Sequence, residues 1–168
     1  MRFAPAAAAL SLAFAVTASV GLRAEQPVDP RAAMLIVDGD AAMAAGNTQA
    51  AIDAYEAALV ISPGHTPILL QLAAAARKDG LQGKAIRLYR EALARDPGNL
   101  LAIGGEGAAL VEKGAVDRAR RNLAQLESLC GADCPETERL AATISTGAQE
   151  QVLTAEAVMP DAVVTQSN

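Results

Sequence analysis

The sequence predicts an all-α protein built as an α-solenoid, with about three helix-turn-helix repeats and one further helix after them. Residues 52–65 read IDAYEAALVISPGH and residues 86–99 read IRLYREALARDPGN, so similar residues recur at an offset of 34. Self-similarity at this period is typical of stacked helical repeats. The composition agrees, because hydrophobic residues make up 52% of the chain and aromatic residues only 2%. Many of the small residues are alanine, which is the best helix former and a poor strand former.

Residues 1–24 have the pattern of a secretion signal. Arg2 supplies the positive start, and an uncharged run extends from Phe3 to Leu22. Small residues then offer cleavage after Ala18 or after Ala24. Cleavage would deliver the chain to the periplasm or the exterior, with no transmembrane stretch remaining. The alternative is an uncleaved segment that anchors the protein, because about 20 uncharged residues can just span a bilayer.

A polar linker at residues 25–31 leads into three frames of equal length, at 32–65, 66–99 and 100–133. Each frame contains two helical stretches separated by a turn that is marked by glycine. The expected helices are Ala32–Ala45, Gln49–Ile61, Pro67–Lys78, Gln82–Arg95, Leu100–Lys113 and Val116–Leu129. Prolines after the second helices of the first two frames support this division, because proline cannot continue a helix.

Small, aromatic and proline residues recur at matching positions of the three frames. They are Gly39, Ala51, Tyr55, Ala58, Pro63, Ala73, Ala85, Tyr89, Ala92, Pro97, Gly107 and Ala119. This pattern resembles the tetratricopeptide repeat (TPR) family, whose members are right-handed α-solenoids. Small residues let the two helices of a repeat approach, and a bulky residue fills the gap beside them. The family's Trp at position 4 is replaced by Leu35, Leu69 and Ile103, and the third frame matches least well.

The resemblance also implies a surface for a partner protein, because the first helices of successive repeats line a concave groove in this family. The residues carried over are Ile36, Asp40, Met43, Leu70, Ala74, Arg77, Lys78, Leu101, Ala108 and Val111. The set is mostly apolar, which suits a helix or an extended peptide. Two plainer interpretations stay open. The apolar residues could simply pack against a neighbouring helix, and the dipole of their helix favours Arg77 and Lys78 at its C-terminal end.

Cys130 and Cys134 are the only cysteines, in the segment LCGADCPE between the last repeat and the helix that follows. In an exported protein an even cysteine count indicates a disulfide, which would hold that helix on the array. A redox-active pair is the alternative, although three residues separate the cysteines instead of the two of the common redox motif. Zinc would need four ligands, and only His65 could join the pair.

Residues 134–148 are expected to form a capping helix and residues 149–168 a flexible tail. Leu140, Ala141 and Ile144 make an apolar stripe that would cover the exposed end of the array, as terminal repeats require. The stretch from Gln149 to Ala157 could extend this helix.

Composition and motifs exclude several classes of function. The formal net charge is −5, and nucleic-acid binding needs a basic face. The glycine-rich stretch 104–107 has neither the preceding strand nor the Lys-Ser/Thr pair of a phosphate loop. His65 is the sole histidine, in an inter-repeat turn. We therefore expect no catalytic residue, no cofactor and no metal.

These observations predict a non-catalytic periplasmic adaptor or scaffold that holds a peptide or helix of another protein in its groove. Two alternatives stay open. One is a redox or chaperone-like accessory protein that uses Cys130 and Cys134. The other is a structural protein that associates with itself.

Overall fold

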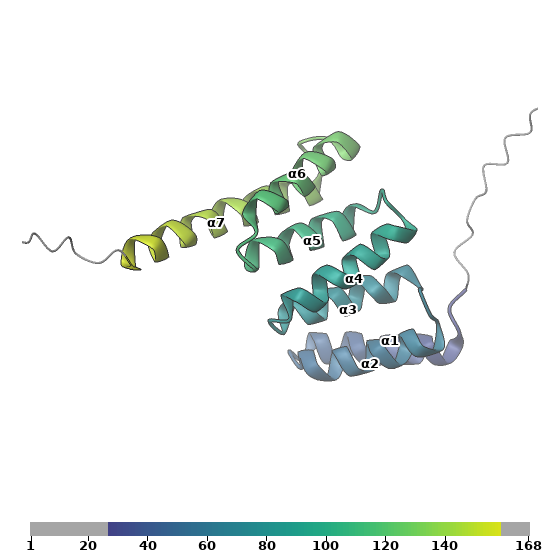
Figure 1. Ribbon diagram of the computed structural model, residues 1–168. Coiled ribbons are helices and arrows are strands. Elements are labelled where there is room, and N and C mark those ends of the chain that lie inside the picture. The colour runs from purple at the N-terminus through teal and green to yellow at the C-terminus, as the bar shows by residue number, and fades with distance from the viewer. Residues whose placement is uncertain (1–26, 159–168) are drawn as a thin grey trace, which may run out of the picture.

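The structure is a computed structural model that describes residues 27–158, all of them helix, turn or loop (Figure 1). Its helices are α1 (Pro30–Ala44), α2 (Thr48–Ile61), α3 (Thr66–Lys78), α4 (Gln82–Arg95), α5 (Leu100–Glu112), α6 (Val116–Cys130) and α7 (Pro135–Val158). The expected secretion signal, residues 1–24, lies outside the described residues, as does the end of the expected tail, residues 159–168.

The helices form three pairs that stack in chain order. α1 packs on α2, α3 on α4 and α5 on α6, while α2–α3 and α4–α5 contacts join successive pairs. Figure 1 shows the pairs following one another from the purple to the green end of the array. The all-α solenoid expected from the sequence is confirmed. The second and third pairs lie within the frames 66–99 and 100–133, and the first pair begins at Pro30, two residues before the frame 32–65.

The helix boundaries follow from side-chain caps and from glycines. The side chains of Asn47 and Asn99 accept hydrogen bonds from the amides of Ala50 (3.2 Å) and Ala102 (2.9 Å), which fixes the starts of α2 and α5. Asp29 caps α1 in the same way through the amide of Arg31, so α1 begins two residues before the expected Ala32.

The turn inside each repeat contains a glycine in the left-handed region, with φ of 77° at Gly46 and 80° at both Gly80 and Gly114. A side chain makes this conformation costly, so the position strongly favours glycine. The position 34 residues after Gly114, where the next turn glycine would stand, is Ala148, within α7. There α7 makes no turn and continues to Val158, so residues 149–158 of the expected tail are helical.

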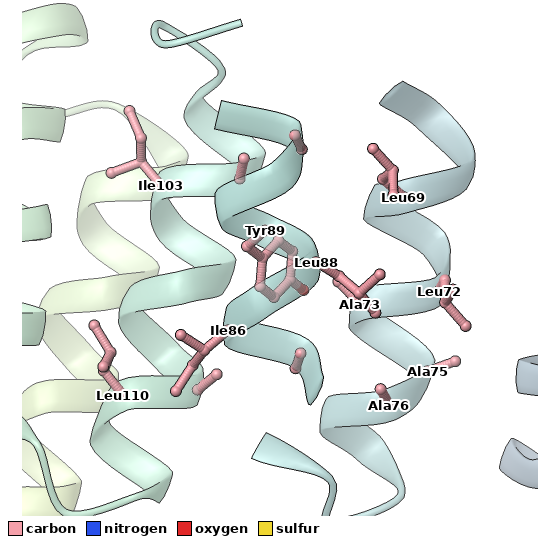
Figure 2. Close-up of a cluster of buried hydrophobic side chains, with 14 of the residues drawn as sticks. Leu69, Leu72, Ala73, Ala75, Ala76, Ile86, Leu88, Tyr89, Ile103 and Leu110 are labelled. Carbon is pink, nitrogen blue, oxygen red and sulfur yellow. The ribbon is translucent and has the colours of Figure 1, made fainter. Parts of the chain in front are cut away.

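The core consists of alanines and a few larger side chains between neighbouring helices. Figure 2 shows Tyr89 of α4 among these residues, with Ala73 on α3 to one side and Ile103 on α5 to the other. Glycines make the close approaches possible. A Cβ atom at Gly39 would lie 2.7 Å from Cδ1 of Tyr55, and one at Gly105 would lie 2.7 Å from the hydroxyl of Tyr89.

The last helix, α7, packs against both α5 and α6, and its contact with α5 is more extensive than that between α3 and α5. Glycines on both helices explain the difference. A Cβ atom at Gly107 of α5 would lie 2.6 Å from Cδ2 of Leu140, and one at Gly147 of α7 would overlap Val111. The glycine-rich stretch of α5 is therefore a packing surface for α7 as well as for Tyr89.

Candidate functional site

The residues predicted for the partner groove lie on α1, α3 and α5, and we call the surface that they form the first-helix face. Side-chain hydrogen bonds join these helices across the face. The amide nitrogen of Gln71 on α3 donates to Asp40 on α1 (3.1 Å). Arg77 on α3 donates to Glu112 on α5 at 3.0 Å, an ion pair in which both side chains are about one-third exposed. The face is thus continuous from the first repeat to the third.

The apolar part of the face is formed by Ile36, Met43, Leu70 and Leu101. Ile36, Met43 and Leu70 are half-buried, and their inner sides pack against the core. The plainer packing interpretation is therefore correct for part of each of these side chains. Leu101 differs, because it is 58% exposed at the start of α5. Exposed Leu101, together with half-buried Leu70 and Ile36 on the other two first helices, leaves apolar surface available to a partner.

Two predicted groove residues are not available. Ala108 and Val111 are buried, and Val111 lies against Gly147 of α7. Sequence reasoning placed them on an open surface because they occupy the repeat positions of Asp40 and Met43. The sequence predicted a capping helix over the end of the array, but nothing in α5 alone shows that this helix will cover Ala108 and Val111. The prediction of an open groove at these two positions was wrong.

The polar part of the face is organised by Asp40. Its carboxylate accepts a hydrogen bond from the hydroxyl of Tyr55 (2.6 Å) in addition to the bond from Gln71. Tyr55 is buried, and this burial, followed by the bond to Asp40, raises the pKa of its hydroxyl well above the usual value. Asp40, which the sequence placed in the groove, thereby links α1, α2 and α3 through hydrogen bonds that the sequence did not predict.

The basic spot expected at Arg77 and Lys78 is only half present. Arg77 is neutralised by Glu112, which also accepts a weak hydrogen bond from Gln82 (3.4 Å). Lys78 is exposed at the end of α3. Burial raises the pKa of the nearby Tyr89. The charge of Glu112 also raises this pKa, whereas the charge of Arg77 lowers it.

One buried charge lies outside the face. Glu106 on α5 accepts hydrogen bonds from Arg90 (2.7 Å) and Asn122 (3.2 Å). Asn122 also donates to the carbonyl of Ile103 (3.1 Å). Glu106 occupies the repeat position that Leu72 has in the second repeat. A charged residue at an apolar repeat position is therefore the sequence feature that could have indicated this buried charge. Because its hydrogen bonds are made within the array, we assign it to the joint between the second and third repeats.

Cys130 ends α6 and Cys134 immediately precedes α7. Their sulfur atoms lie at disulfide distance, and their Cα atoms are 5.7 Å apart. The backbone carbonyl of Cys134 accepts from the amide of Glu138 (3.0 Å), so this residue also begins α7. The pair therefore spans the corner between the array and the helix that covers it.

The described residues hold no group of three or more His, Cys, Asp or Glu side chains arranged to bind a metal ion. His65 precedes α3, in the expected inter-repeat turn, and is half-buried. Among the described helices, none combines the length and the apolar character needed to cross a membrane.

Comparison with known proteins identifies the fold. No family model matches the sequence, and no curated protein matches it. Solved structures do match, and the TPR domain of Sgt2 from Aspergillus fumigatus is one of them. It is 25% identical and has a TM-score of 0.63, over 88% of this chain and 96% of that one. The fold is that of a tetratricopeptide-repeat domain.

Two further matching structures were solved with a bound partner. The TPR2B domain of yeast Sti1, in complex with pHsp70, is 17% identical with a TM-score of 0.65, over 73% of this chain and 99% of that one. The Yersinia enterocolitica type III secretion chaperone SycD, in complex with a peptide of the translocator YopD, is 20% identical with a TM-score of 0.59. That match covers 73% of this chain and 93% of SycD. At these identities the likeness establishes the fold alone.

Proposed function

We propose that the protein is a non-catalytic adaptor or scaffold that binds a segment of another protein on its first-helix face. One observation carries the proposal: α1, α3 and α5 present Ile36, Leu70 and Leu101 on a surface that side-chain hydrogen bonds hold in place. A surface with apolar side chains and a few fixed polar groups suits a peptide or an amphipathic helix. Two structures that match this chain were solved with a partner: Sti1 TPR2B in complex with pHsp70, and SycD in complex with a peptide.

The proposed site is smaller than the groove expected from the sequence. It runs from α1 to the start of α5, and α7 closes it at Val111. The charges on it are Asp40, exposed Lys78 and the Arg77–Glu112 pair. Because both signs are present, we propose that apolar contacts supply most of the affinity and that the charges fix the orientation of the partner.

Export to the periplasm is part of the proposal. It rests on the sequence of residues 1–24 and on the cysteine pair, which would persist as a disulfide in an oxidising compartment. Mass determination of the mature chain tests it, since cleavage after Ala18 or Ala24 gives two distinct masses. An intact N-terminus on the purified chain would contradict cleavage and would favour the alternative, an uncleaved segment that anchors the protein.

In-cell crosslinking followed by mass spectrometry tests the adaptor role. Leu101→Glu places a charge on exposed apolar surface and should remove the main crosslinked partner while the helix content stays unchanged. Leu70→Glu should act in the same direction. Val60→Glu is the matched control, because Val60 is 79% exposed on α2, outside the face. A partner that survives both face variants would contradict binding at this surface.

A redox or chaperone-like accessory role is the second candidate, and the position of the cysteine pair favours it. The pair lies at the start of the helix that covers Val111, so breaking the bond would loosen a wall of the proposed site. Thiol titration under mild dithiol reductants separates the roles. A pair that resists reduction until the protein unfolds is structural, and one that exchanges readily in the native protein supports redox work.

A further inference from the structure

The outer side of α1 is exposed although the same side of the later first helices is covered. Residues 34 positions apart occupy equivalent places in the repeats. Ile68 and Ala102 are fully buried, whereas Met34, at the same place in the first repeat, is 71% exposed. The difference lies in what precedes each helix, because α3 and α5 follow a complete repeat and α1 is the first helix among the described residues.

Contacts in the third repeat identify what normally covers this side. Gly105 and Glu106 of α5 face Tyr89 and Arg90 of α4, the second helix of the preceding repeat. The equivalent residues of α1 are Val37 and Asp38, which are both exposed, Val37 at 65%. Ala75 and Ala109 are fully buried, and their equivalent, Ala41, is exposed. We call Met34, Val37, Asp38 and Ala41 the end face.

The end face has a charge pattern that complements itself. Arg31, Met34 and Asp38 lie at intervals of three and four residues, so they share one side of α1, with Val37 beside them. When two copies of this stripe run antiparallel, the positive end of each lies opposite the negative end of the other. Parallel packing would instead place like charges together. The exposed Arg31–Asp29 pair (3.2 Å) does not prevent this, because surface ion pairs contribute little.

We infer that the end face is a dimerisation surface, on which α1 of a second copy packs antiparallel to α1. Met34 and Val37 form the apolar centre, and Arg31 of each copy pairs with Asp38 of the other. The contact is isologous, so it closes at two copies and does not propagate into a filament.

The dimer leaves the proposed partner site free. Ile36 is two residues from Met34 and therefore lies on a different side of α1, and it also packs inward against the core. Asp40, three residues after Val37, lies at the border between the end face and the first-helix face. Each dimer therefore presents two first-helix faces. A partner with two binding segments, or a partner that is itself dimeric, would be held more tightly than by one copy. The inference stands apart from the adaptor role, because a monomer can still bind a peptide.

Sedimentation velocity over a concentration series tests the inference on the chain as cells process it, with its N-terminus determined by mass. The wild-type protein should shift from monomer to dimer as concentration rises. Val37→Glu should weaken the dimer by roughly tenfold or more, since it buries a charge at the centre of the contact. Val60→Glu, an equally drastic change at an exposed valine of α2, should leave the dimer unchanged.

A charge exchange makes the test specific to the antiparallel arrangement. Asp38→Lys and Arg31→Glu should each weaken the dimer, and the two together should restore it. A wild-type chain that remains monomeric at roughly 100 µM overturns the inference, because even a contact of micromolar affinity would be populated there. A dimer that Val37→Glu does not weaken, or whose charge exchange fails to restore association, overturns it equally.

Discussion

At the C-terminal end of the array, α7 lies on α5 and α6 and brings Leu140 against Gly107. At the N-terminal end, Met34 and Val37 point outward from α1, and no other described helix covers them. Both ends have the same kind of repeat beneath them. What differs is whether residues 27–158 include another helix on that side. Burial in a repeat array is thus set by the neighbouring unit as much as by the residue itself.

The largest expected effect compares two equivalent positions in different repeats. Ile68→Ala should lower the free energy of unfolding by about 2 to 5 kcal/mol, because it leaves a cavity between α3 and the preceding repeat. Met34→Ala should change it by no more than about 0.5 kcal/mol, since most of the side chain is in water. Urea unfolding of both variants at low protein concentration measures the difference.

The same two variants could also contradict the proposed difference between the covered and the exposed end of the array. A large loss for Met34→Ala at low concentration would mean that the end face is covered within one chain. A loss that appears only at high concentration would instead point to the second copy. Similar small losses at both positions would show that the contact between the first and second repeats contributes little to stability.

The covered end can be opened by a single substitution. Gly107→Val should destabilise the protein by up to about 3 kcal/mol, because the new side chain occupies the space of Leu140. Gly83→Ala is the control, since a Cβ atom there meets nothing within 4 Å in α4. It should stabilise by up to about 1 kcal/mol through helix propensity. Hydrogen exchange should show faster exchange in α7 for the first variant only. Unchanged protection of α7 would contradict close packing at Gly107.

The cysteine pair should add a smaller contribution at the same end. Cys134→Ser should lower the free energy of unfolding by about 2 kcal/mol, the loop-closure value for so short a ring. The effect should be strongest on the exchange rates at the start of α7. Wild-type protein treated with a dithiol reductant should behave like the variant, and Cys134→Ser itself should not respond to the reductant. If Cys134→Ser leaves both the free energy of unfolding and the hydrogen-exchange rates of α7 unchanged, the cysteine pair has no structural role.

The sequence predicted the repeats better than it predicted their surroundings. Residues such as Tyr55, Ala85 and Pro97 are repeated because each unit packs in the same way, so a single period reveals the whole array. The position of α7 over Val111 is not periodic, and it depends on glycines that meet only in three dimensions. The turn glycines are visible in the sequence, and the alanine at their counterpart, Ala148, agrees with the continuation of α7 to Val158.

The candidate site shows the same limit on a smaller scale. Ile36, Leu70 and Leu101 were placed on one surface by repeat position alone, and the structure places them on successive first helices. The Asp40–Tyr55 and Arg77–Glu112 pairs could not be predicted, because they join residues from different helices at distances of 2.6 and 3.0 Å. Periodicity predicts which side a residue takes, and it does not predict which polar side chains will meet there.

The smallest expected effect concerns the hydrogen bond that joins α2 to α1 at the open end. Tyr55→Phe removes the bond to Asp40 and should cost about 1 kcal/mol at pH 7. The cost is modest because Asp40 is exposed and keeps its bond to Gln71. In the wild type, burial and Asp40 raise the pKa of Tyr55. The folded protein therefore holds this proton more tightly than the unfolded chain, where tyrosine titrates near pH 10.

The sign of the pH dependence follows from that difference. The stabilisation from Tyr55 is complete below about pH 10 and is lost as the pH rises above it. Urea midpoints measured from pH 7 to pH 11 should fall for the wild type and fall less for Tyr55→Phe, so the two curves converge at high pH. Tyr89→Phe is the comparison in the second repeat, where burial also raises the tyrosine pKa. Parallel curves for Tyr55→Phe and the wild type would mean that Tyr55 titrates as it does in the unfolded chain. The first repeat would then be open in solution, and the contrast between the two ends of the array would extend from the surface of α1 to its packing on α2.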